Sequence, residues 1–269
     1  MTTDQIGRKA GERLKALREK RPLIHNITNH VVMNYTANAL LASGASPVMA
    51  HAREEVEEMV SLAGALVLNI GTLTSPWVEA MLLAGKRANE LNIPVILDPV
   101  GSGATRFRTD SATRLLRELS IHVVRGNASE ILSLVESESR TKGVDAIHKV
   151  DEVRDAALQL AKTLGTTLAI TGPVDLTTDG ERIVQISNGH ELMGTVTGTG
   201  CTASALVGAF CAVETDPVDA AASALAYFGL AGEMAASSAQ GPGTFQMALL
   251  DALFNIDSPR LEKGAKIKN

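Results

Sequence analysis

The chain has 269 residues, of which 45% are hydrophobic and 20% charged, and its formal net charge is -5. Nucleic-acid-binding proteins usually carry a basic excess and often stack bases on aromatic rings, whereas only 3% of these residues are aromatic. We therefore expect a soluble globular protein with no nucleic-acid partner. At about 100–200 residues per domain, this length allows one large domain or two small ones.

The cysteine usage and the charge pattern indicate a cytoplasmic protein. Cys201 and Cys211 are too few for a disulfide framework and lack zinc-ligand spacing, which fits a reducing compartment. Segment 1–20 has mixed charges and no apolar core, so we expect no signal peptide. Two stretches without Asp, Glu, Lys or Arg, 22–52 and 192–213, are interrupted by the polar runs HNITNH and TVTGTGCT. We therefore expect no membrane span.

Helices and strands alternate in the first part of the chain. Thr28 or Asn29 is suited to cap one helix, and Ser75 with Pro76 is suited to begin another. Over residues 3–101 we expect, in order, a helix at 3–20, an apolar segment at 22–28, a helix at 30–44, a strand at 46–49, an acidic helix at 52–63, a strand at 64–70, a helix at 71–92 and a strand at 94–101.

The alternation continues to the end, with one hairpin signalled by an Asp179-Gly180 turn. We expect helices at 109–119, 128–135, 151–165, 201–213, 216–238 and 242–254, strands at 121–127 and 166–172, and two short strands within 176–187. Continuous apolar strands separated by helices predict an α/β fold with three α/β/α layers and a mostly parallel central sheet. We expect one domain over 1–269, with residues 258–269 as a loose tail.

Polar residues follow four of the expected strands: Asn69, Asp98, the Arg125–Asn127 run and Thr171. In open α/β sheets, ligands bind beyond the carboxyl ends of the strands. Any one of these residues could instead cap a helix. Together they indicate a site for phosphate or metal.

The most specific motif is TVTGTGCTASALVGAF at 195–210, where a glycine-rich turn precedes an apolar helix. The amide groups and the dipole at a helix N-terminus bind anions, and Gly198 and Gly200 would let a ligand approach the backbone. An ordinary glycine-rich turn is the alternative. No P-loop signature occurs, and both GSGATR (101–106) and GTGCTA (198–203) lack the last glycine of the dinucleotide fingerprint. The motif therefore favours a phosphate site of another design.

The run NASE, Asn127 to Glu130, has two interpretations. Asn127 and Glu130 have the spacing of a capping box. Alternatively, with Asp98, they could hold a hydrated Mg²⁺ near phosphates, because this ion favours a few oxygen ligands and retained waters. The run alone does not separate these interpretations.

An ordered set of segments resembles the hydroxyethylthiazole kinase family. They are PLIHNITNHVVMNYTANALLASGASPVMA, LVLNIGTLT, VILDPVGSGA, VRGNASEI, TGPVDLTTDG, TVTGTGCTASALVGAF and QGPGTFQMALLDAL, and they span nearly the whole chain. The resemblance implies a ribokinase-like fold and Mg²⁺-dependent transfer of phosphate from ATP to the hydroxyl of 4-methyl-5-(2-hydroxyethyl)thiazole, in thiamine biosynthesis or salvage. It also implies a homotrimer with active sites between subunits, which would bury the uncharged stretch 22–52.

The resemblance also assigns residues to roles. It implies thiazole contacts from Met49, Gly198 and Asn29, ATP contacts from Arg125, Thr171 and Asn127, and metal ligation by Asp98 and Glu130.

Cys201 stands where related sugar and pyrimidine kinases often carry an aspartate. A helix N-terminus can lower the pKa of a thiol, although phosphoryl transfer depends mostly on positioning and charge neutralisation. We expect Cys201 to orient or weakly deprotonate the alcohol, and the amides of 198–201, Gly198 and Gly200 included, to stabilise the transferring group. We expect Cys211 to be a buried structural thiol.

Three other functions remain open. The first is a hydroxymethylpyrimidine kinase, which would require a different pocket chemistry. The second is an ADP- or ATP-dependent dehydratase of NAD(P)H hydrates with a similar fold, which Cys201 in place of aspartate disfavours. The third is a nucleotide- or thiazole-binding sensor without activity, against which Asp98 and Glu130 argue.

Overall fold

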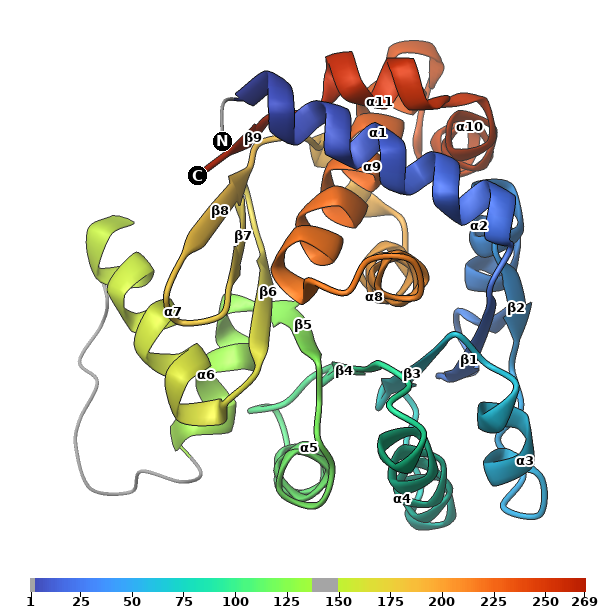
Figure 1. The fold of residues 1–269 in the computed structure, drawn as a ribbon, viewed down its shortest axis with the longest axis vertical. Helices are drawn as coiled ribbons and strands as arrows, with labels where there is room; N and C mark the ends of the chain where they lie inside the picture. Colours follow the sequence, from blue (N-terminus) through green and yellow to red (C-terminus); the bar gives the residue numbers. More distant parts are fainter. Residues whose placement is uncertain (1–2, 137–149) are drawn as a thin grey trace.

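A single sheet runs through the protein. The structure is a computed structural model that describes residues 3–136 and 150–269. All the strands it describes join one nine-stranded sheet in the order β2-β1-β3-β4-β5-β6-β7-β8-β9, parallel from β2 to β6 and antiparallel beyond (Figure 1). The strands are β1 Leu23–Ile27, β2 Ser46–Val48, β3 Ala65–Asn69, β4 Val95–Asp98, β5 Val123–Asn127, β6 Thr167–Thr171, β7 Asp175–Thr178, β8 Ile183–Ile186 and β9 Ile267–Lys268.

Helices cover both faces of the sheet, as Figure 1 shows. One face carries α1 Thr3–Lys20, α2 Met33–Ser43, α8 Thr199–Cys211, α9 Pro217–Ser238, α10 Pro242–Asn255 and α11 Ser258–Gly264. The other carries α3 Val56–Ser61, α4 Ser75–Glu90, α5 Arg106–Glu118, α6 Ala128–Glu136 and α7 Val150–Leu164. None of these helices has the length and apolar character needed to cross a membrane.

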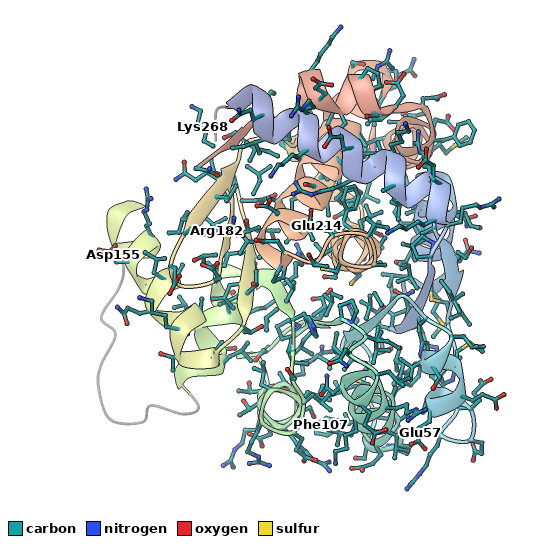
Figure 2. The ribbon with its side chains drawn as sticks, in the orientation of Figure 1. Glu57, Phe107, Asp155, Arg182, Glu214 and Lys268 are labelled. Carbon is teal, nitrogen blue, oxygen red and sulfur yellow. The ribbon has the colours of Figure 1, made fainter. Side chains whose placement is uncertain are left out.

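The strand sequences explain the two-sided core. Along β3, Val67 faces the α8 side, whereas Leu66 and Leu68 face the α4 side, because successive side chains of a strand alternate between faces. Side chains fill the layers on both sides of the sheet (Figure 2). The predicted three-layer α/β/α fold with a mostly parallel sheet is therefore confirmed, and the single sheet supports the proposal of one domain.

The sequence predicted the hairpin correctly but placed two helix caps at the wrong residues. The predicted hairpin is present, since β7 and β8 pair across residues 179–182 and Gly180 has φ +92°. The predicted caps are wrong, by one residue for α4 and by three or four for α2. Thr74, not Ser75, caps α4, because its Oγ1 accepts the Trp77 N–H at 3.4 Å. Helix α2 begins at Met33, with neither Thr28 nor Asn29 as its cap.

The C-terminal residues do not form the expected loose tail. They form α11 and then β9, which pairs antiparallel with β8. Helix α11 lies tightly against α1, since a Cβ at Gly7 would come within 2.5 Å of the Glu262 carbonyl oxygen. The prediction failed because a short charged helix and a two-residue strand carry too few apolar positions to show a period.

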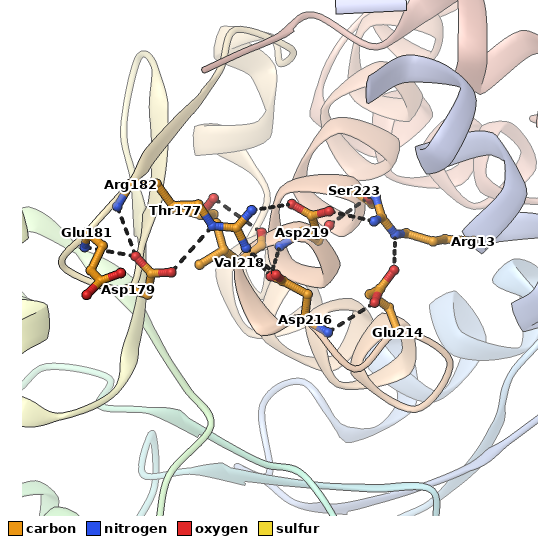
Figure 3. Close-up of polar contacts among 10 residues, drawn as sticks. All are labelled: Arg13, Thr177, Asp179, Glu181, Arg182, Glu214, Asp216, Val218, Asp219 and Ser223. Atoms are coloured by element: carbon orange, nitrogen blue, oxygen red, sulfur yellow. Dashed lines mark hydrogen bonds and ion pairs between the residues drawn. The ribbon is translucent and has the colours of Figure 1, made fainter. Parts of the chain in front are cut away.

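A network of ion pairs joins α1, the β7–β8 turn and the start of α9 (Figure 3). Arg13 is 8% exposed, and its guanidinium donates to Glu214 and Asp219, each at 2.7 Å. Arg182 approaches from the other side and pairs with Asp216 and Asp219. Asp219 therefore bridges two arginines from distant parts of the chain.

We expect Arg13→Ala to lower the free energy of unfolding by about 2–4 kcal/mol, because it leaves the partly buried Glu214 without its arginine and Asp219 with Arg182 alone. Arg8→Ala on the same helix is the matched control. Arg8 and Glu12 are 63% and 64% exposed, so this pair contributes little. Urea unfolding of both variants measures the difference, and equal stabilities would contradict the network's role.

Candidate active site

The parallel strands bring the predicted polar residues to one edge of the sheet. Asn69 and Asp98 end β3 and β4 and stand opposite each other in the ladder. Asn127 and Thr171 do the same at the ends of β5 and β6. Because the strands run in parallel, these side chains share the carboxyl edge where ligands bind in such sheets.

The N-terminus of α8 lies at this edge. Gly198 caps the helix with φ +87°, a conformation that favours glycine, and the Thr202 N–H donates to its carbonyl at 2.8 Å. The N–H groups of 199–201 precede this first helical bond and therefore point out of the first turn. A Cβ at Gly198 would lie 2.7 Å from Val32 Cγ1, so the segment after β1 closes one side of the turn.

Arg125 lies on the other side of this helix N-terminus. Its side chain is buried and donates from Nη2 to Thr171 Oγ1 at 2.5 Å, while Nε has no partner among the described residues. A Cβ at Gly200 would lie 2.8 Å from Arg125 Nη1. The guanidinium and the amides of the first turn thus face the same space, where an anion would meet both.

That space is a cavity of about 560 Å³, within the range of about 300–1,000 Å³ typical of small-molecule sites. Arg125, Thr171, Thr199 and Gly200 line it, together with residues of α9 and of the 187–194 segment. Asp175 also lines it, and burial raises the pKa of this carboxyl to about 6, while the Gly172 N–H and Arg125 act in the opposite direction.

A chain of hydrogen bonds lies on the Cys201 side of the helix N-terminus. Asn29 Nδ2 donates to Asn69 Oδ1 at 2.8 Å, and Asn69 Nδ2 donates to Asp98 Oδ2 at 2.7 Å. The Ser204 hydroxyl donates to the same Asp98 oxygen at 2.8 Å. We call Asn29, Asn69, Asp98 and Ser204 the Asn–Asp chain. Asn29 Oδ1 accepts the Val31 N–H at 3.1 Å, before α2 begins at Met33, so this oxygen does not cap the helix.

Cys201 contacts this chain through its sulfur, which lies 3.4 Å from Asn29 Nδ2. Desolvation by burial raises the pKa of the thiol to about 11, and the Asp98 charge acts in the same direction. Burial therefore outweighs the lowering of the thiol pKa that a helix N-terminus can cause. A neutral thiol at this position can orient a hydroxyl but is a poor base.

The carboxylates expected to bind metal have different surroundings. Asp98 is 1% exposed, and its Oδ1 has no hydrogen-bond partner among the described residues. Burial raises the pKa of Asp98 to about 6. Glu130 accepts the Gly101 N–H and the Asn127 N–H, each at 2.9 Å, and its own N–H donates to Asn127 Oδ1 at 2.9 Å. The capping box at NASE is therefore present.

Magnesium remains compatible with this arrangement. Each carboxylate oxygen can accept more than one bond, and the orphaned Asp98 Oδ1 is a buried acceptor that a hydrated cation would satisfy. Within residues 3–136 and 150–269, no three His, Cys, Asp or Glu side chains gather into a metal cluster. The unpartnered Asp98 Oδ1 fits an ion that keeps water and phosphate ligands, as Mg²⁺ does.

Two predicted site residues, Met49 and Asn127, are not among the residues that line the cavity. Met49 follows the edge strand β2 and is half-buried. Asn127 is exposed, and its Oδ1 accepts from Ser129 and Glu130 instead of lining the cavity. As expected, Cys211 is buried, in the core around α8 and α9.

The histidines near the site do not join the Asn–Asp chain. His25 is fully buried and its Nε2 bonds the Ala50 carbonyl oxygen at 2.8 Å, with the pKa lowered by burial. The rings of His30 and His51 contact Trp77, with centroids 4.7 and 4.4 Å away. These contacts agree with structural roles.

Sequence reasoning did not find three parts of the site: Ser204, Asp175 and the 187–194 segment. Ser204 lies inside an apolar helix. Asp175 belongs to the run GPVD, which is typical of an ordinary turn and gives no sign of a site. The 187–194 segment offered a weak signal, since polar and glycine residues precede the glycine-rich turn directly. Only the fold brings it to the cavity.

The fold places the protein among those with a ribokinase-like architecture. A solved ribokinase-like superfamily protein from Enterococcus faecalis is 15% identical, with a TM-score of 0.64 and coverage of 91% of this chain and 95% of that chain. At this identity the likeness shows the fold alone, which is ribokinase-like. Proteins of much higher similarity define the family.

The hydroxyethylthiazole kinase family model matches residues 14–259. Hydroxyethylthiazole kinase from Desulfotalea psychrophila is 62% identical over 96% of this chain and 95% of its own length. The solved hydroxyethylthiazole kinase protein from Pyrococcus horikoshii OT3 is 48% identical, with a TM-score of 0.90 and coverage of 97% and 98% of the two chains. The chain belongs to the hydroxyethylthiazole kinase family, whose members are kinases, and the predicted resemblance is confirmed.

Proposed function

We propose that this enzyme transfers the γ-phosphoryl group of ATP to the hydroxyl of 4-methyl-5-(2-hydroxyethyl)thiazole, in thiamine biosynthesis or salvage. One observation carries the proposal. The N-terminus of α8 stands between a cavity bordered by Arg125 and the Asn–Asp chain, which includes Asn29. Donor and acceptor can therefore meet at the same amide groups.

The protein groups suit phosphoryl transfer without a strong base. The N–H groups of 199–201 are aimed where negative charge would gather, and preorganised donors of this kind stabilise a transition state. Arg125, held by Thr171, would neutralise phosphate charge on the cavity side. Asn29 and Cys201 would orient the alcohol on the other side. Positioning and charge neutralisation dominate such reactions.

We propose Asp98 and Glu130 as the groups that hold a hydrated Mg²⁺. When bound, this ion would neutralise charge on the phosphates. The support is the orphaned Oδ1 of Asp98 and the second lone pairs of the Glu130 oxygens. Asn69 and Ser204 keep the other Asp98 oxygen in place, so its orientation does not depend on the metal.

We also propose a homotrimer with active sites at the subunit interfaces, in the cytoplasm where ATP is supplied. Helices α2 and α10 contact each other and carry exposed apolar side chains. Leu41 is 55% exposed, Met247 71% and Phe254 69%. Burying such a surface would be favourable. Met49 at the edge strand would then reach a site completed by a second subunit, and sedimentation velocity tests for the trimer.

The substrate is tested with ATP, Mg²⁺ and three acceptors in parallel. We expect phosphate transfer to hydroxyethylthiazole, little transfer to hydroxymethylpyrimidine, and no repair of NADH hydrate. EDTA should abolish turnover. Transfer mainly to the pyrimidine, or NADH-hydrate repair without thiazole phosphorylation, would refute the proposal. Binding of both ligands without turnover would identify a sensor instead.

Cys201 gives a prediction about pH. Because the thiol has a pKa of about 11, it stays protonated from pH 7 to 9, so kcat should show no rise from thiol ionisation in this range. We expect Cys201→Ser to keep most of kcat and Cys201→Ala to lose about tenfold through poorer orientation of the alcohol. Cys211→Ala is the control for simple loss of a thiol. An unchanged rate in Cys201→Ala would contradict the orienting role.

A further inference from the structure

The 187–194 segment forms a large part of the wall of the nucleotide cavity, and we call it the wall segment. Its lining residues are Ser187, Asn188, Gly189, His190, Glu191, Met193 and Gly194. The segment connects β8 to the turn that leads into α8, and none of it belongs to a strand of the sheet. Something other than strand pairing must therefore hold it in place.

Asn188 is the residue that holds the wall segment to the C-terminal residues. The residue is 7% exposed, and both its side-chain nitrogen and its side-chain oxygen form hydrogen bonds. Nδ2 donates to the Gly264 carbonyl at 2.9 Å, and Oδ1 accepts the Lys266 N–H at 2.7 Å. The Ser187 N–H also donates to the Lys266 carbonyl at 3.0 Å. The C-terminal segment thus forms a backbone support for the wall.

Glu233 on α9 joins the same arrangement. Its Oε1 accepts from Asn188 Nδ2 at 3.1 Å and from the Gly189 N–H at 3.0 Å, while Oε2 pairs with Lys266 Nζ at 2.9 Å. The carboxylate therefore bonds to the wall segment and to the C-terminal segment at once. Residues more than 30 positions apart meet here, so the wall position depends on all three parts of the chain.

The facing side of α9 is shaped to receive the wall segment. A Cβ at Gly229 would lie 2.6 Å from the Cβ of Asn188, and a Cβ at Gly232 would lie 2.5 Å from the Met193 sulfur. Glycine at both positions lets the wall approach the helix backbone. The wall therefore fits against α9 in a defined place, and the hydrogen bonds select that place.

We propose that Asn188, Glu233 and the C-terminal segment 264–268 position the nucleotide-binding wall and thereby set the affinity for ATP. The inference rests on the proposed function, since it takes the cavity as the ATP site. None of these groups is assigned a part in the chemistry. Their loss should weaken nucleotide binding while leaving the alcohol side and the transfer step nearly intact.

The test compares nucleotide binding with alcohol binding in the full-length enzyme. In Asn188→Asp, the new carboxylate faces the Glu233 carboxylate and the Gly264 carbonyl, with no proton to donate. We expect KM for ATP and the calorimetric Kd for ADP to rise about tenfold, equivalent to about 1.4 kcal/mol. We expect kcat and KM for the alcohol to change less than about twofold.

A second substitution should partly restore binding. In the double variant Asn188→Asp/Glu233→Gln, a side-chain nitrogen in the place of Glu233 Oε1 can donate to the new carboxylate at position 188, and the carbonyl oxygen in the place of Oε2 can accept from Lys266 Nζ. The Gly189 N–H loses its acceptor, so part of the lost ADP affinity should return. Glu233→Gln alone should weaken ADP binding less than Asn188→Asp does. It replaces Asn188→Asp as the test if that variant folds poorly. Lys266→Ala is the matched control, because it removes only the Nζ pair, in which the lysine side chain is 56% exposed.

The outcomes separate the inference from the proposed function. Unchanged ADP affinity in Asn188→Asp, or equal weakening of ADP and alcohol binding without rescue, would overturn the positioning role. If the wild-type enzyme bound no ADP, the proposed function would fail, and this inference with it. Selective weakening that the second substitution partly reverses supports the proposal.

Discussion

Gly200→Val should lower kcat/KM for ATP by about a hundred- to a thousandfold, the loss typical of removing a preorganised donor for a developing charge. The Cβ of the new side chain would lie 2.8 Å from Arg125 Nη1. Either the guanidinium moves away from Thr171 or the first turn of α8 shifts. Both changes separate the Arg125 guanidinium from the N–H groups of the first turn, which should bind the phosphates together.

Gly194→Val is the matched control. Gly194 lines the same cavity, but a Cβ there would meet nothing within 4 Å. We expect at most a small change in its KM for ATP. Steady-state kinetics and ADP calorimetry on both variants make the comparison, and equal losses would show that filling the cavity, not displacing Arg125, causes the effect.

Asp98→Asn should lower kcat by about a hundredfold or more, because it removes a charge proposed to hold magnesium near the phosphates. The substitution preserves shape, and its carbonyl oxygen can accept from Asn69 and Ser204 as Asp98 Oδ2 does. The Mg²⁺ concentration for half-maximal rate should also rise. Ser204→Ala, which removes one hydrogen bond but no charge, should cost far less.

The same variant should remain folded. Burial raises the pKa of Asp98 to about 6 in the folded protein, above its unfolded value of 3.8, so its contribution to stability is lost as pH rises through about 6. An uncharged Asn avoids this loss. We therefore expect the Tm of metal-free Asp98→Asn to equal or exceed that of the wild type at pH 7.5. A lower Tm with a matching activity loss would indicate a structural role only.

The sequence predicts the sheet and its carboxyl edge well for a physical reason. Strands such as β3 and β4 are buried on both faces, so they are continuous apolar runs ending in one polar residue, Asn69 or Asp98. Parallel pairing then brings these ends together. Fold class and much of the site follow from that pattern alone.

Other features depend on tertiary contacts that no local pattern contains. The pKa of Cys201 rises because the fold buries it, against the effect of the helix N-terminus. Residues 258–269 are ordered by pairing with β8 and by contacts with α1. Asn188 looks like any polar loop residue until the C-terminal segment and Glu233 surround it.

We propose that phosphoryl transfer takes place at the N-terminus of α8, between Arg125 and the Asn–Asp chain. A crystal structure with a non-hydrolysable ATP analogue, Mg²⁺ and hydroxyethylthiazole tests it most directly. We expect the γ-phosphate within hydrogen-bond distance of the N–H groups of 199–201, with Arg125 on one side and the alcohol beside Asn29 and Cys201 on the other. A triphosphate bound elsewhere, or an alcohol out of line with it, would contradict the account.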